Sequence, residues 1–418
     1  MVKSSSLFVA VVIFFLASAS VASASQPSVY HVTDYGARAD PKTDSTSALS
    51  DAWRKACSDP RPSVVYVPHG RFHVRNLGFE GPCRSKDILV RIDGTLVAPS
   101  DYSVIGNAKN WILFHDVDGV RISGGILDGQ GTGLWSCKLD GRKDCPTGAM
   151  VSFASFPLLL IRSLYFMQNL HIANSKNVEI DGLTSVNSQK FHIAVTGSQN
   201  VNLRDITVTA SGTSPNTDGI HIEKSTLVSV LNSTISTGDD CISMGPGARN
   251  VWIERVACGP GHGISIGSLG WKLQEPGVQN VTVKRVHFTE TTNGLRIKTW
   301  ARRSLGFVRN VLFHHVVFDG VKNPILIDQN YCPGGRNCPR QASGIKVSDI
   351  RYKSIRGTSQ SKVAVRFECS KANPCAGITM HDVKLTYVGG GRGEEATATC
   401  ANARGTSSGF VMPVVRYL

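Results

Sequence analysis

A short motif recurs along most of this chain, and its spacing limits the fold more than any other feature. Clear copies begin at Gly119, Asn177, Asn200, Asn250, Asn280 and Asn310, and weaker copies begin at Leu227, Gly344 and Gly377. In each copy apolar residues alternate with polar ones, which is the two-residue period of a strand with one buried face. From residue 177 onward the starts are 23 to 34 residues apart. Strand repeats of that length predict a parallel β-helix, an all-β solenoid whose coils stack on one another.

A β-propeller is the alternative repeat architecture, but its blades need about 40 residues each, so it fits the spacing less well. No Pro-rich or Gly/Ser-rich linker divides the chain, so we expect one domain over residues 25–418. The asparagines that recur at one register are expected to stack, with side-chain amides bonded along the column.

A solenoid also needs a cap at each end. The segment from Thr46 to Cys57 is the one good helix candidate, with Asp44 or Ser45 as its N-cap. Its apolar stripe consists of Ala48, Leu49, Ala52, Trp53 and Ala56. We therefore expect a short capping helix over the N-terminal end of the coil.

Residues 1–24 are typical of a secretory signal peptide. Lys3 provides the positive start, Leu7 to Leu16 the short apolar run, and Ala22-Ser23-Ala24 the small-residue cleavage site. That run is too short to span about 30 Å of hydrocarbon. We therefore expect a secreted, extracellular protein with no membrane association after cleavage.

The cysteines fit an oxidising compartment. The chain has 11 Cys, and pairing neighbours (57/83, 137/145, 241/258, 332/338 and 369/375) would close five loops and leave Cys400 alone. Spacing alone does not fix the connectivity. Asn232 and Asn280 each begin a glycosylation acceptor sequence, which also fits export.

Residues 151–168 interrupt the repeat with a stretch dense in Leu and Phe. A membrane helix is a poor interpretation, because the stretch contains Pro157 and places Arg162 near its middle, where a charge costs about 2.5–3.5 kcal/mol. We interpret the stretch as an insertion between coils, either a partly buried loop or sequence from an unremoved intron.

The net charge of +14, or +13 without Lys3, favours an anionic partner. Nucleic acid is not expected, because the sequence has neither a reading helix nor aromatic residues interleaved with basic ones, and the protein is expected to be exported.

The residues with the most chemical potential lie between positions 214 and 298. Asp218 is 21 residues before Asp239, and Asp239 is 23 residues before His262. These intervals match one coil, so the three motifs should lie side by side, with Asp240 among them. Carboxylates that close cannot all ionise freely, and at least one pKa should rise. A neutral acid beside an ionised base is what hydrolysis of a glycosidic bond requires.

Each motif by itself has a plainer interpretation. An Asn-Thr-Asp-Gly sequence is usually a turn, and a single His is more often structural. Asp239-Asp240 lacks the surrounding ligand loop of a calcium site. Arg296 and Lys298 lie on the same side of a strand, where they either pair with neighbouring acids or face a carboxylated substrate. The joint occurrence at coil spacing favours a catalytic site.

The motifs Asn216-Thr217-Asp218-Gly219, Gly238-Asp239-Asp240-Cys241, Gly261-His262-Gly263 and Arg296-Ile297-Lys298 resemble the four signatures of the polygalacturonases, glycoside hydrolase family 28, particularly the plant enzymes. The resemblance runs from about Tyr30 to Tyr387. It implies a right-handed parallel β-helix, inversion at the anomeric carbon, and no metal or organic cofactor. It also implies a monomeric cell-wall enzyme whose partner is the acidic polysaccharide polygalacturonate.

The resemblance also assigns roles to single residues. Asp239 corresponds to the general acid, Asp218 and Asp240 to the pair that activates water, and His262 to the residue that supports protonation of the acid. Arg296 and Lys298 correspond to the binders of the substrate carboxylate, Tyr331 to the aromatic residue at the cleavage subsite, and Asn216 to a further substrate-binding position.

Several segments are closer to pollen-type exopolygalacturonases than to fruit-ripening endo enzymes, so exo action is expected, with endo action as the alternative. Two further alternatives are a calcium-dependent pectate lyase-like eliminase and an inactive cell-wall protein that binds pectin. The chain departs from the family pattern in the 151–168 insertion and in its short C-terminus, which lacks the cysteine that would pair with Cys400.

Overall fold

The computed structural model describes residues 26–418 except 41, 107, 109, 147–167, 390–393 and 417. The signal peptide expected at residues 1–24 lies outside the described residues. So does the insertion expected at residues 151–168, apart from Gln168, which is the first residue of a strand.

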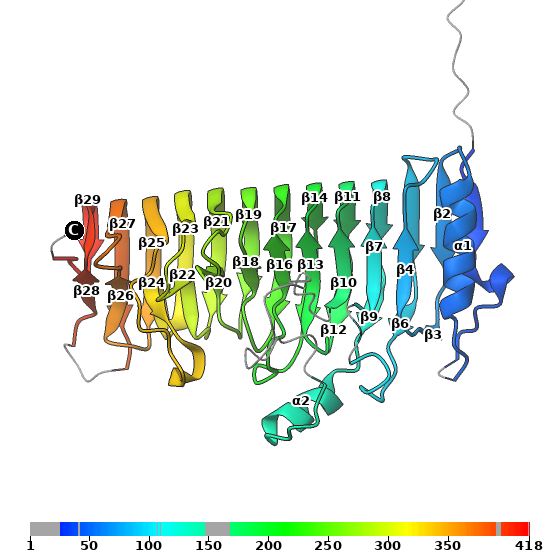
Figure 1. Ribbon diagram of the computed structural model, residues 1–418, viewed down its shortest axis with the longest axis horizontal. Coiled ribbons are helices and arrows are strands. Elements are labelled where there is room, and N and C mark those ends of the chain that lie inside the picture. The colour runs from blue at the N-terminus through cyan, green and yellow to red at the C-terminus, as the bar shows by residue number, and fades with distance from the viewer. Residues whose placement is uncertain are drawn as a thin grey trace, which may run out of the picture.

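The strands form two parallel sheets that run along a single elongated coil (Figure 1). The larger sheet contains β1 (Ser28–His31), β2 (Ser63–Val67), β3 (Arg71–His73), β5 (Ile88–Ile92), β6 (Thr95–Val97), β8 (Asp118–Ser123), β9 (Ile126–Asp128), β11 (Lys176–Asp181), β12 (Thr184–Val186), β14 (Gln199–Arg204), β15 (Thr207–Thr209), β17 (Thr226–Ser236), β19 (Arg249–Cys258), β21 (Val278–Thr289), β23 (Phe307–Val321), β25 (Lys346–Ser359), β27 (Cys375–Tyr387) and β29 (Ala403–Met412). The smaller sheet contains β4 (Leu77–Glu80), β7 (Ile112–His115), β10 (Gln168–Ala173), β13 (Phe191–Thr196), β16 (Ile220–Glu223), β18 (Ile242–Met244), β20 (Ile264–Leu269), β22 (Asn293–Trp300), β24 (Asn323–Tyr331), β26 (Val363–Glu368) and β28 (Thr397–Ala401).

Each strand pairs with its counterpart one coil away, which is the right-handed parallel β-helix expected from the repeat and the resemblance. The residue before the first buried valine of the repeat motif adopts a positive φ, for example +52° at Asn250 and +56° at Asn280. Its side-chain amide bonds along the column: Asn280 Nδ2 donates to Asn250 Oδ1 at 2.9 Å, and Asn310 Nδ2 donates to Asn280 Oδ1 at 2.8 Å. The predicted asparagine column is confirmed there, and Leu227 interrupts it.

One predicted copy is out of register. Val311 pairs with Ile350, and Asp349 has the positive φ of that column, so the copy begins at Asp349 and not at Gly344. The alternation that begins near Gly344 belongs to an earlier part of the same strand, where Val347 pairs with Val308.

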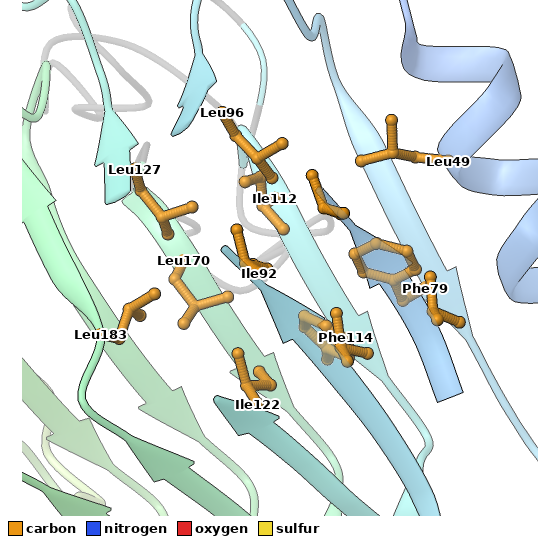
Figure 2. A pocket seen from close by; sticks show the side chains of 13 residues that line it. Leu49, Phe79, Ile92, Leu96, Ile112, Phe114, Ile122, Leu127, Leu170 and Leu183 are labelled. Carbon is orange, nitrogen blue, oxygen red and sulfur yellow. The ribbon is translucent and has the colours of Figure 1, made fainter. Parts of the chain in front are cut away.

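The expected capping helix is α1 (Thr46–Ser58), which lies at the N-terminal end of the coil (Figure 1). Asp44 Oδ1 accepts the Thr46 N–H at 3.0 Å, so Asp44 is the residue whose side chain caps the helix. Trp53 packs edge-on against Phe79 and Phe114, with ring centroids 5.0 and 5.7 Å away. Figure 2 shows that Leu49 of α1 joins the apolar side chains inside the first coils. The cap therefore closes the core that the strands build.

Three short helices lie outside the expected pattern: α2 (Thr132–Leu139) and the 3₁₀ turns η1 (Val32–Tyr35) and η2 (Pro333–Gly335). Disulfides join all five neighbouring cysteine pairs, and Cys400 is a free thiol, as the spacing suggested. Within the described residues, neither α-helix has the length and apolar character needed to cross a bilayer.

Candidate active site

Three consecutive coils bring the predicted acids together. Asp218 comes just before β16, Asp239 and Asp240 just before β18, and His262 just before β20. These three strands pair in register, with Ile242 between Ile220 and Ile264. The predicted stacking of the motifs is therefore confirmed.

Glycines allow these turns to approach one another. Gly261 has a φ of +149°, and a Cβ there would lie 2.8 Å from the carbonyl oxygen of Asp239. A Cβ at Gly263 would lie 2.1 Å from the carbonyl oxygen of Asn293. The His262 N–H donates to the Asp239 carbonyl at 2.7 Å, so this close approach fixes the histidine beside the acid.

Asp240 is the most completely neutralised of the carboxylates. Its side chain is 1% exposed, and its Oδ1 accepts bonds from Arg296 Nη2 at 2.6 Å and Ser265 Oγ at 2.8 Å. Its Oδ2 accepts a bond from Lys298 Nζ at 2.8 Å. Burial by itself would raise the pKa of Asp240, but Lys298 and Arg296 outweigh it and lower the pKa to about 2. Asp240 is therefore ionised in the folded protein at ordinary pH.

The pKa of Asp218 is shifted in the opposite direction. Burial, followed by the charges of Asp239 and Asp240, raises its pKa well above the ordinary value. Ser243 Oγ lies 2.7 Å from Asp218 Oδ2, and His221 Nδ1 lies 2.8 Å from the same hydroxyl. The expectation that one carboxyl pKa of the cluster rises is confirmed at Asp218.

Asp239 is the most accessible acid of the three. Its side chain is 19% exposed, compared with 1% for Asp240, and its Oδ1 lies 3.0 Å from Nδ1 of His262. The His262 side chain is 39% exposed. A ligand arriving from solvent therefore meets Asp239 and His262 first.

The basic pair and an aromatic residue continue the site along β22 and β24. Lys298 Nζ lies 5.4 Å from the ring centroid of Tyr331, so Tyr331 covers the lysine that holds Asp240. The Tyr331 ring lies edge-on to Trp300, at 5.2 Å between centroids, and Trp300 lies edge-on to Trp271, at 4.8 Å. Asn216 is exposed, with a φ of +58°, in the loop that leads to Asp218.

Sequence reasoning missed the hydroxyls and the histidine that support the acids. Ser243 and Ser265 occupy equivalent positions in β18 and β20, where they pair with each other in register. His221 pairs with Ser243 one coil earlier. A serine one coil away from each buried aspartate was the available signal, but serines inside strands are too common to reveal this role.

A metal ion fits this cluster poorly. Donor atoms of Asp239, Asp240 and His262 lie within 4.8 Å of one another, which is close enough for a shared ion. Asp240 already has two cations as partners, so an added cation would meet a carboxylate that is neutralised. We derive no chemical step through a metal.

The chain matches the family described as glycosyl hydrolases family 28 over residues 57–156 and 165–409. The gap in that match falls inside the stretch interpreted as an insertion. The chain is 53% identical over 409 residues to a polygalacturonase of Prunus persica, and the match covers 98% of both chains. It is 41% identical to an exopolygalacturonase of Platanus acerifolia, covering 94% of this chain and 98% of that one.

Two solved structures share the fold. An exopolygalacturonase from Thermotoga maritima has a TM-score of 0.69 at 21% identity, covering 86% of this chain and 87% of that chain. A polygalacturonase from Erwinia carotovora has a TM-score of 0.66 at 24% identity, covering 92% and 97%. Both structures superpose on the coil described above over most of its length.

Proposed function

The chain belongs to glycosyl hydrolase family 28, and we propose that it hydrolyses α-1,4-galacturonosyl bonds of polygalacturonate and pectin. The observation that carries this proposal is the stacking of carboxyls with different surroundings: Asp240 is ionised between two cations, whereas Asp239 is the accessible carboxyl and lies beside His262. Hydrolysis of a glycosidic bond needs a general acid at the leaving oxygen and a general base for the water on the opposite face.

In the proposed mechanism Asp239 donates a proton to the leaving glycosidic oxygen. Asp239 is the most accessible carboxyl of the three, so it is the one that a bound glycosidic oxygen can reach. His262 supports Asp239 through the contact at 3.0 Å. Its own partial exposure places it where it can keep that acid supplied with protons from solvent.

Asp240 and Asp218 then position and deprotonate the attacking water. Asp240 supplies the anionic oxygen, and Asp218 orients the water from the neighbouring coil. Water attacks from the face opposite the leaving group, so the configuration at the anomeric carbon inverts.

Arg296, Lys298 and Tyr331 are proposed to hold the uronate unit at the cleavage point. A guanidinium offers five N–H donors and an ammonium three, and Asp240 uses only some of them. The remaining donors suit a substrate carboxylate, while Tyr331 offers an aromatic edge to the sugar ring. Asn216 is proposed as a further contact from the rim of the site.

We further propose that the enzyme is an exopolygalacturonase, a galacturan 1,4-α-galacturonidase, that acts as a secreted monomer in the cell wall. The exo assignment is supported by the names of several relatives, including the protein of Platanus acerifolia. Product sizing on a defined oligogalacturonate tests it, because exo action releases monomer alone and endo action releases mixed oligomers.

The hydrolytic proposal is tested with the secreted protein and de-esterified polygalacturonate. Wild type should generate reducing ends, and Asp239→Asn should reduce the rate by about 10²–10⁴-fold. Asp319→Asn removes an exposed acid of β23 and serves as the matched control, with no expected change. If wild type is as inactive as Asp239→Asn, the proposal is wrong. Unsaturated products and inhibition by chelators would indicate an eliminase instead.

A further inference from the structure

A row of basic side chains runs along the outside of the larger sheet, on strands that follow the acids in the chain. Lys284, His314, Lys353 and His381 pair in register on the successive strands β21, β23, β25 and β27. Arg356 and Lys384 form a second pair beside them on β25 and β27. These six residues are called the basic row. Figure 1 shows their four strands side by side toward the C-terminal end of the coil.

The basic row has little compensating charge. Among the described residues, no carboxylate lies within ion-pair distance of Lys284, Lys353, Arg356 or Lys384. The nearest coil on one side carries Glu254, but that acid pairs with Arg255 and Arg285.

Within the basic row, Asp382 forms an ion pair with His381 alone, at 3.1 Å, and its Oδ1 also accepts the Phe410 N–H. Like charges directly opposite each other on neighbouring strands are unfavourable, and Arg356 and Lys384 form such a pair on β25 and β27. Burial and the nearby His315, Lys353 and Lys284 lower the pKa of His314, which reflects the same crowding of positive groups. Folding gains nothing from such a row, so an external anion is its expected partner.

Two exposed aromatic side chains flank the basic row. Trp252 on β19 is 42% exposed, and Lys284 Nζ lies 6.0 Å from its ring centroid. Phe410 on β29 is 56% exposed, and Lys384 Nζ lies 6.0 Å from its ring centroid. Neighbouring coils are about 4.8 Å apart, so the row and its aromatic ends form a straight track along the long axis.

We propose that the basic row binds a stretch of polyuronate that is separate from the stretch being cleaved. Basic side chains repeat once per coil, a spacing close to the length of one sugar in a 1,4-linked chain, and Lys284, Lys353, Arg356 and Lys384 supply the permanent charges that carboxylates along the polymer can meet. The aromatic residues at both ends suit sugar rings. The inference rests on the proposed function only for the identity of the polymer.

The row cannot belong to the catalytic site itself. The acids precede strands of the smaller sheet, and Arg296 and Lys298 lie within that sheet on β22. The basic row lies on strands of the larger sheet. A polymer held there keeps the enzyme on its matrix while the cleft engages and releases chain ends.

The test uses two triple variants with the same change in net charge. Lys353→Gln/Arg356→Gln/Lys384→Gln removes half of the basic row. Lys55→Gln/Arg75→Gln/Lys176→Gln removes three exposed cations near the N-terminal end and is the control. Both sets are made in an Asp239→Asn background, and dissociation constants for long polygalacturonate are measured by affinity electrophoresis at several NaCl concentrations. Melting curves verify that all variants fold.

We expect the row variant to bind polygalacturonate about fivefold or more weakly at low salt, with a shallower salt dependence. The control variant should remain within about twofold of its parent. With Asp239 restored, the row variant should cleave a trimer of galacturonate at the parental rate. Equal losses in both variants would mean that net charge alone governs retention, and no loss in either would mean that the cleft alone binds. Both results overturn the proposal.

Two probes examine the identity of the partner. If double-stranded DNA or phosphatidylserine vesicles bind through the row more tightly than polygalacturonate does, the proposed partner is wrong. If the wild type fails to hydrolyse polygalacturonate but the row variant still loses affinity for it, the proposed function fails and this inference stands.

Discussion

Replacing two neighbouring carboxylates by asparagine should change stability in opposite directions. Asp240 is an anion between buried cations, whereas burial and the charges of Asp239 and Asp240 raise the pKa of Asp218. An asparagine has nearly the same shape as either acid but cannot ionise. The two substitutions therefore isolate the charge of each carboxyl group.

Asp240→Asn should destabilise the protein. It leaves Arg296 and Lys298, whose side chains are 11% and 9% exposed, without their counter-charge. Breaking a buried ion pair from one side costs about 3–5 kcal/mol. With an unfolding entropy of about 2.1 cal/mol/K per residue, that cost lowers the melting temperature of a chain of this length by about 4–6 °C.

The pH dependence of this loss follows from the lowered pKa. The folded-state pKa of Asp240 is about 2, below its ordinary value of 3.8. The contribution of the Asp240 charge to the free energy of unfolding is therefore complete above pH 3.8 and disappears as the pH falls toward 2. The difference between wild type and Asp240→Asn should be full at pH 7 and should shrink below pH 4.

Asp218→Asn should have the opposite effect. The folded-state pKa of Asp218 is raised, so above pH 3.8 the unfolded chain gains by ionising while the folded protein does not. Wild type should therefore become less stable than Asp218→Asn as the pH rises from 3.8 toward the folded-state pKa. Below pH 3.8 both side chains are neutral and the two proteins should melt together.

Calorimetric melting from pH 3 to pH 8 measures both effects, with Asp319→Asn as the surface control. A melting temperature of Asp240→Asn equal to or above that of wild type at pH 7 would refute the charge assignment for Asp240. A loss of stability in Asp218→Asn that is independent of pH would refute the assignment for Asp218. Both variants should lose activity, which a stability effect alone does not explain.

Three other substitutions test the coil around the site. Gly261→Ala adds a Cβ that meets the Asp239 carbonyl, and the displaced turn should lower kcat by roughly 100-fold, whereas Gly141→Ala, at an open position of positive φ, should not. Asn310→Ala should lower the free energy of unfolding by about 1–2 kcal/mol, measured by thermal unfolding, because the variant loses the hydrogen bond to Asn280 and a side chain that tolerates positive φ. Asn310→Gly should lower it less, because glycine adopts positive φ freely. Replacing Cys241 and Cys258 by serine opens a 17-residue loop beneath the acids and should lower stability by about 3 kcal/mol; a melting temperature that does not change would show that the packed coil holds this turn unaided.

The architecture was predictable because one physical requirement repeats in every coil. Each coil must turn at the same register, and a left-handed residue such as Asn250 or Asn280 marks that turn in the sequence. The Gly344 copy was misplaced because β25 alternates on both sides of its turn, so alternation alone does not locate Asp349. The helix α2 was missed because it is short and joins loops rather than coils.

The acids of the site were predictable because their separation equals one coil. What sequence could not supply is which partner each acid takes. Arg296 and Lys298 were expected either to bind substrate or to pair with acids, and the structure shows that both pair with Asp240. That choice depends on side chains reaching across two coils, which linear spacing does not encode.

These pairings couple the proposed substrate site to the proposed base. Arg296 and Lys298 each donate a hydrogen bond to Asp240, and their remaining N–H groups can donate to a uronate carboxylate. When that carboxylate binds, it shares the positive charge that holds the pKa of Asp240 low. The pKa of Asp240 then rises, and Asp240 becomes a stronger base for water at the moment when substrate is in place. Without substrate the same cations keep Asp240 weakly basic, so we propose that Arg296 and Lys298 both bind the uronate and time the activation of water.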